Sequence, residues 1–193
     1  MIASRISAAV WSFVALASIP VSAQQGQSSC DAHSAHSKTA SDSPAAGANH
    51  HAKVNERGDA VMGFDHETTT HHFRLAPDGG AIEITANAQA DAESRTAIRS
   101  HLSHIAKMFA AGNYQAPMLI HDQVPPGVPV MVARKAKLRW SYEDLPAGAK
   151  LSASTKDPEA LAAIHEFLRF QIEDHQTGDP REVQASPAQP TPR

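Results

Sequence analysis

The chain is poor in cysteine and in aromatic residues, and no stretch concentrates charge of one sign. It has one cysteine, Cys30, among 193 residues, so no disulfide can form within it. Aromatic residues make up 5%, and the 17 basic residues are scattered in a chain of net charge −3. A slightly acidic sequence without a basic stripe excludes nucleic acid as the expected partner. Because no disulfide can form, core packing or a bound metal must hold the folded part together.

The one long apolar run lies at the start, between Ile6 and Ile19. Arg5 precedes it, and small residues up to Ala23 follow it, which is the pattern of a cleavable secretory signal. We therefore expect residues 1–23 to be a signal peptide and the protein to be periplasmic or secreted. No later segment is apolar enough to cross a bilayer, so we expect no stable membrane insertion after cleavage.

Composition divides the remaining chain into three parts. Residues 24–57 are rich in Gln, Ser, Ala, Gly and His and have almost no large apolar side chains, which predicts a disordered, histidine-rich segment. Residues 58–179 carry the periodic apolar patterns of one folded domain. Residues 180–193 are rich in proline and polar side chains and predict a second disordered tail.

Within the domain, two hairpins are each followed by a helix. The predicted strands are 70–76, 81–87, 137–143 and 149–154. Asp91 and Asp157 have the side chain and position of helix N-caps, and Gly112 and Gly178 follow the expected helix ends. The predicted apolar stripes are Ile98, Leu102, Ile105 and Phe109, and then Leu161, Ile164, Leu168 and Ile172. The proline-rich connection 117–133 suggests a short strand at 128–132. The predicted fold is α+β, with two hairpin-plus-helix units packed as one antiparallel sheet layer covered by two helices.

Histidine is the most informative residue type. The chain has 12 histidines, and none lies in residues 1–23. Neutral imidazole is a good ligand for copper and zinc, and a flexible chain can bring several imidazoles to one ion. The segment before the domain is expected to collect metal ions through His33, His36, His50 and His51.

A fixed metal site is predicted inside the domain. His101 and His104 are three residues apart on one helix, and Met108 lies four residues further on the same face. Strand alternation directs His71 to the core side, with His66 in the loop before it. The predicted ligands for copper or zinc are His66, His71, His72, His101, His104 and Met108. The remaining histidines have simpler interpretations: His165 as a hydrogen-bonded core residue, His121 as a turn residue or ligand beside Asp122, and His175 at a favourable helix end.

A resemblance to a known family rests on four runs of sequence. They are Met62-Gly63-Phe64-Asp65-His66, Thr69-Thr70-His71-His72-Phe73-Arg74-Leu75, His101-Leu102-Ser103-His104-Ile105-Ala106-Lys107-Met108-Phe109 and Asp174-His175-Gln176-Thr177-Gly178-Asp179. Over residues 62–180 the chain resembles an exported bacterial family of unknown function. Some members carry the label aspartate carbamoyltransferase, which this sequence does not support because it is too short and has no carbamoyl-phosphate loop. The resemblance implies export and a compact domain, and it implies no catalytic residues.

The function predicted from these observations is binding or handling of copper or zinc in the periplasm. An alternative is a histidine-dependent enzyme, with His71 or His72 as general base oriented by Asp65 or Glu67. A further alternative is a non-catalytic envelope binding domain. The sequence has no serine-nucleophile elbow, phosphate-binding loop or haem-attachment motif. A closed apolar pocket around His71 and His72 would favour the enzyme. The sequence indicates no particular protein partner.

Overall fold

The computed structural model describes residues 44–88 and 91–185, which belong to the compact unit Ala40–Arg193. The predicted signal peptide, 1–23, lies outside the described residues, as do Cys30, His33 and His36. Within the described ranges, no helix has the length and apolar character needed to cross a membrane.

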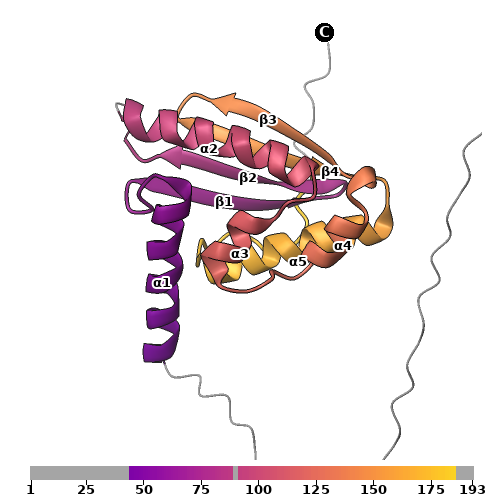
Figure 1. The fold of residues 1–193 in the computed structure, drawn as a ribbon, viewed down its shortest axis with the longest axis horizontal. Coiled ribbons are helices and arrows are strands. Elements are labelled where there is room, and N and C mark those ends of the chain that lie inside the picture. Colours follow the sequence, from indigo (N-terminus) through magenta and orange to yellow (C-terminus); the bar gives the residue numbers. More distant parts are fainter. Residues whose placement is uncertain (1–43, 89–90, 186–193) are drawn as a thin grey trace, which may run out of the picture. The chain divides into compact units, whose positions relative to one another are not determined.

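The described residues form five α-helices, one short 3₁₀ helix and four strands (Figure 1). The helices are α1 (Pro44–Met62), α2 (Ala92–Ala110), α3 (Gln115–His121), α4 (Val128–Ala133), η1 (Lys135–Lys137) and α5 (Pro158–Asp174). The strands are β1 (Thr69–Ala76), β2 (Gly79–Ala86), β3 (Arg139–Leu145) and β4 (Gly148–Ser154). The α+β prediction is confirmed.

The four strands form a single antiparallel sheet in the order β1-β2-β4-β3. Each hairpin is followed by a helix, as predicted, but the helices exchange partners. The helix of the first unit, α2, packs mainly on β3 and β4, whereas α5 packs on β1 and β2. The two units therefore share one core and neither has a complete core of its own.

Local sequence explains why α2 and α5 begin where they do. The Asp91 carboxylate accepts a hydrogen bond from the Ser94 N–H, and the Asp157 carboxylate accepts one from the Ala160 N–H, each at 2.9 Å. The Ser94 hydroxyl, together with the Ser94 N–H, holds the pKa of Asp91 below the ordinary value, and the Ala160 N–H does the same for the pKa of Asp157. Gly112, with φ 81°, follows the end of α2. Both predicted caps are confirmed.

Side-chain alternation sorts the sheet into a covered face and an open face. The covered face carries Phe73 and Leu75 of β1, Ile82 and Ile84 of β2, and Ala149, Leu151 and Ala153 of β4, all buried. The predicted α2 stripe is buried in full, and α5 buries Phe167 in addition to Ile164, Leu168 and Ile172. His165 is a hydrogen-bonded core residue, as predicted, with its Nε2 2.9 Å from the Ala76 carbonyl.

The predicted disordered segment, 24–57, is wrong over its last part. Residues 44–57 form most of α1, and α1 packs against α3. Val54 is fully buried, and Arg57 Nε donates to the Ile120 carbonyl at 2.6 Å. Over residues 44–57 the amphipathic signal is weak because Val54 is the one large apolar side chain there, and polar contacts supplement it. A compositional argument cannot detect such a helix.

Two further boundaries differ from the predictions. The strand expected at 128–132 is the helix α4, which Pro129 near its start and the left-handed Gly127 (φ 80°) favour over a strand. The predicted tail, 180–193, is docked over its described part, 180–185. There the Gln184 N–H donates to the Leu75 carbonyl at 2.9 Å, and Arg169 Nε donates to the Arg181 carbonyl at 3.0 Å.

Candidate functional site

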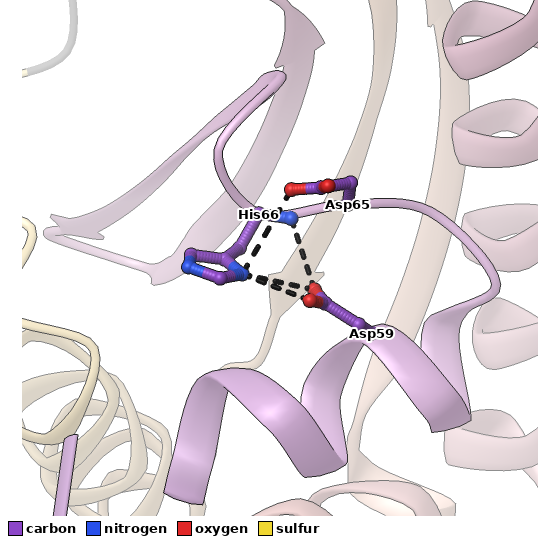
Figure 2. Close-up of side chains that lie close together, drawn as sticks. All are labelled: Asp59, Asp65 and His66. Atoms are coloured by element: carbon purple, nitrogen blue, oxygen red, sulfur yellow. Dashed lines mark hydrogen bonds and ion pairs between the residues drawn. The ribbon is translucent and has the colours of Figure 1, made fainter. Parts of the chain in front are cut away.

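The loop between α1 and β1 places one histidine between two carboxylates (Figure 2). His66 Nδ1 lies 3.0 Å from Asp59 Oδ2 and 4.0 Å from Asp65 Oδ1. Asp59 also accepts the backbone N–H of His66, and Asp65 accepts the backbone N–H of Glu67, so both carboxylates are held in place. One donor atom from each of these three residues lies within 4.8 Å of the others. This separation suits the ligands of a single metal ion.

A polar cavity of about 210 Å³ opens beside this group. Four histidines from separate elements line it: His51 of α1, His66 of the loop, His71 of β1 and His175 after α5. The His71 and His175 rings are stacked, with centroids 5.8 Å apart and planes inclined by 6°. The cavity is therefore walled by imidazoles that lie far apart in the sequence.

Asp174, the last residue of α5, connects two other histidines. Its carboxylate lies 2.5 Å from His121 Nδ1 of α3 and 2.6 Å from His50 Nε2 of α1. His121 is buried, and its Nε2 lies 3.0 Å from Oε1 of Gln171. Because His51 Nε2 also bonds to the His175 carbonyl at 3.2 Å, the histidines of α1 fix this helix to the end of α5.

The C-terminal run 174–179 folds back along β1. Gln176 and Gly178 adopt left-handed conformations, with φ 52° and 72°, which turn the chain sharply. Asp179 then accepts hydrogen bonds from the Phe73 N–H and the Thr177 hydroxyl, at 2.9 and 2.8 Å. Burial of Asp179 acts to raise its pKa, but these bonds outweigh it and leave the pKa below the ordinary value. The turn presents the His175 ring to His71.

An apolar cavity of about 60 Å³ is also lined by His71 and His175. Both residues, with Met62, line the two cavities and so form a shared wall. His101 of α2 also borders the apolar cavity. Burial, with His101 nearby, lowers the pKa of His71 to about 4, and burial lowers the pKa of His101 to about 4. Burial also lowers the pKa of His175, so all three imidazoles are neutral at pH 7.

The structure separates the six predicted ligands. His71 and His101 border one cavity, and His66 shares the other cavity with His71. His72 points to the opposite face of the sheet, where its Nδ1 lies 2.9 Å from Asp179 Oδ1. The other two members, His104 and Met108, are respectively exposed and half-buried on α2. One ion cannot bind all six, because strand alternation places His71 and His72 on opposite faces.

Sequence reasoning missed the residues that complete the site. Asp59 has no motif around it and follows the segment 24–57 that composition predicts to be disordered. His175 lines both cavities, whereas His121 lines neither and contacts Asp174 and Gln171 instead. Asp122, the expected neighbour of His121, is the left-handed C-cap of α3. The sequence signal for these contacts is the dense polar run 174–179, which contains Asp174, His175 and Asp179.

The fold and site define an α+β domain with a histidine-walled polar cavity beside an apolar one. Comparisons with protein families, curated proteins and solved structures find no match to this chain. The resemblance to an exported bacterial family therefore stays a prediction.

Proposed function

We propose that this protein binds a transition metal ion, zinc or copper, after export, and that Asp59, Asp65 and His66 form the first part of the site. The observation that carries the proposal is the close approach of their donor atoms, all within 4.8 Å of one another. In a tetrahedral site with bonds of about 2.0 Å, ligand atoms lie about 3.3 Å apart. The separations of 3.0 and 4.0 Å from His66 Nδ1 bracket that value.

The chemistry of the donors favours zinc or cupric ion over cuprous ion. Two carboxylates and one imidazole supply hard oxygen and borderline nitrogen ligands, whereas the cuprous ion prefers thioether and thiolate. Met108 belongs to α2 and packs against the core, so it contributes no sulfur to this group. The imidazoles of His51, His71 and His175 around the adjoining cavity provide further neutral ligands.

The alternative of a histidine-dependent enzyme has one observation in its favour, because an apolar cavity does border His71. A general base needs a cavity for the substrate and a carboxylate partner, and neither His71 nor His72 has both. His71 borders the apolar cavity, but its pKa of about 4 makes it a weak base at neutral pH. His72 has a carboxylate partner, Asp179, but lies on the other face of the sheet. This division favours binding over turnover.

The proposal is tested by titrating the full chain with zinc chloride and with copper(II) chloride by calorimetry, with elemental analysis of the metal retained. His33 and His36 are replaced by glutamine in every sample so that they do not compete. We expect Asp65→Asn and His66→Gln each to weaken the tightest site at least tenfold. His104→Gln, on an exposed helix face, is the matched control and should leave affinity unchanged.

Two results would overturn the proposal. One is affinity within twofold of the parent in both Asp65→Asn and His66→Gln, which would show that the metal binds elsewhere. The other is an equal loss in His104→Gln, which would show unspecific binding by surface histidines.

A further inference from the structure

The apolar cavity has features that metal binding at the loop between α1 and β1 does not explain. It lies between the covered face of the sheet and the helices α2, α3 and α5, and most of its lining is apolar. Its volume of about 60 Å³ corresponds to roughly four to six water-sized probes, enough for a molecule of four or five non-hydrogen atoms.

Two buried polar atoms on the wall of this cavity have no hydrogen-bond partner among the described residues. They are His71 Nε2 and Gln171 Nε2. Gln171 is only 4% exposed, so bulk water does not replace the missing partner. Leaving a buried donor or acceptor unpaired costs about 1–3 kcal/mol. Two such atoms beside one cavity indicate that something in the cavity bonds to them.

The neighbours of Gln171 determine which of its atoms faces the cavity. An ionised carboxylate only accepts hydrogen bonds, so Asp174 requires a proton on His121 Nδ1. Gln171 Oε1 lies 3.0 Å from His121 Nε2, so the amide oxygen already has a neighbour and Nε2 is the amide atom without one. The amide N–H₂ is then the free group at the cavity.

We propose that the apolar cavity binds a small neutral molecule with a carbonyl oxygen, which accepts a hydrogen bond from Gln171 Nε2, while a polar group on the same molecule meets His71 Nε2. A charged molecule is disfavoured, because the apolar walls remove its hydration without supplying an opposite charge. Small primary amides have the required size, oxygen and N–H groups. This site is separate from the proposed metal site, since Asp59, Asp65 and His66 do not line the cavity.

Three probes of one shape test the proposal on the full chain without metal. Acetamide, acetate and isobutene share a skeleton of four non-hydrogen atoms and differ in charge and in hydrogen bonding. Binding is followed by NMR through the side-chain signals of Gln171 and His71. We expect acetamide to shift both signals saturably, and acetate and isobutene to bind at least fivefold more weakly, because a net hydrogen bond contributes about 1 kcal/mol.

A matched pair of variants locates the interaction. Gln171→Met keeps the approximate volume and removes the amide donor, so acetamide should bind at least fivefold more weakly while isobutene binding is kept. Gln115→Met, at an exposed position of α3, should change neither. If Gln171→Met does not fold, the comparison of the three probes on the unaltered chain still tests whether binding requires a neutral molecule that forms hydrogen bonds.

Two outcomes would overturn the proposal. Isobutene binding as tightly as acetamide would show a merely apolar cavity that makes no use of Gln171. No shift with any probe would show that the cavity takes up only water. Neither outcome bears on the metal titration, because that test uses Asp65→Asn and His66→Gln, and neither residue lines this cavity.

Discussion

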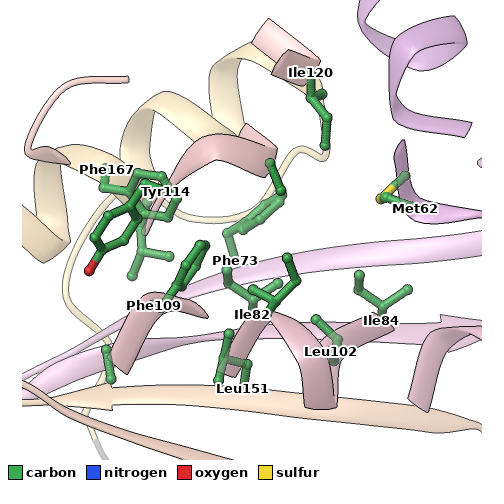
Figure 3. Close-up of a cluster of buried hydrophobic side chains, with 14 of the residues drawn as sticks. Met62, Phe73, Ile82, Ile84, Leu102, Phe109, Tyr114, Ile120, Leu151 and Phe167 are labelled. Atoms are coloured by element: carbon green, nitrogen blue, oxygen red, sulfur yellow. The ribbon is translucent and has the colours of Figure 1, made fainter. Parts of the chain in front are cut away.

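Two ends of the same core, which share the sheet and the helices α2 and α5, are built from different side chains. At one end Phe109 stacks on Tyr114, with centroids 4.5 Å apart, and meets Trp140 and Phe167 at 4.9 and 6.2 Å. The other end carries His71, His101 and His175. Figure 3 shows the aromatic rings gathered on one side and Met62 on the other.

The two ends also differ in how much space they leave. The cavity bordered by Trp140 and Phe167 is about 10 Å³, room for one water. The cavity of about 60 Å³ extends from Phe109 and Phe167 to the histidines, and the cavity of about 210 Å³ is lined by residues of the histidine end.

Buried polar atoms without a hydrogen-bond partner among the described residues occur at both ends: Tyr114 Oη and Trp140 Nε1 at the aromatic end, and His71 Nε2 and Gln171 Nε2 at the histidine end. Only the second pair belongs to residues that line the cavity of about 60 Å³. We therefore expect the aromatic end to contribute most to stability and the histidine end to be the place where a ligand binds.

The largest effect on stability is expected at the aromatic end. Phe109→Ala removes a ring that is 2% exposed and touches three other rings. We expect a loss of about 3–5 kcal/mol in the free energy of unfolding, measured by urea denaturation. The comparison between the two ends fails if the loss is below about 1 kcal/mol.

The next effect is a dependence of stability on pH at the histidine end. The unfolded chain binds a proton at His71 near pH 6.5, but the folded protein does so only near pH 4. Stability from this residue is thus fully present above pH 6.5 and falls as the pH drops towards 4. The expected slope is about 1.4 kcal/mol per pH unit, or roughly 3 kcal/mol across the window.

His71→Phe should remove this part of the slope when urea denaturation is repeated between pH 4 and 7. His101, whose pKa is lowered equally, contributes a similar slope that remains in this variant. Gln115→Met, at an exposed position of α3, is the control, and its slope should match that of the parent. An unchanged slope in His71→Phe would mean that this imidazole is not kept neutral by burial.

A smaller effect concerns α1, which joins the histidine end. Val54→Ala removes two methylene equivalents from a fully buried side chain, and we expect a loss of about 2 kcal/mol. Amide hydrogen exchange should show faster exchange across α1 than in α2. Lys53→Ala, an exposed neighbour, is the control. Equal exchange in parent and Val54→Ala would contradict the attachment of α1 to the domain.

The smallest effect is expected at the cap of α2. Asp91→Ala removes the bond to the Ser94 N–H and should cost about 1 kcal/mol in thermal or urea unfolding. Asp91→Asn retains an acceptor in the same place and should lose much less. Similar losses in the two variants would show that charge at the helix start, rather than the hydrogen bond, stabilises α2.

Much of the fold could be predicted because its signals are local. The Asp91 and Asp157 caps, the apolar stripe of α2 and the alternation in the four strands all operate over a few residues, and all were correct to within about two residues at the strand ends. The site was predicted only in part. His66, His71 and His101 lie beside the cavities, but His72 and His104 do not, because sequence spacing does not say which helix covers which hairpin.

The sequence by itself determined the α+β class, the order of the two hairpin-plus-helix units and the abundance of histidine in a chain with one cysteine. Tertiary structure alone decided which histidines meet. The exchange of α2 and α5 between hairpins, the docking of α1 through Val54 and the turn after Asp174 bring together residues up to 124 positions apart. Such contacts depend on chain topology and on shape complementarity across the core, and no local pattern encodes them.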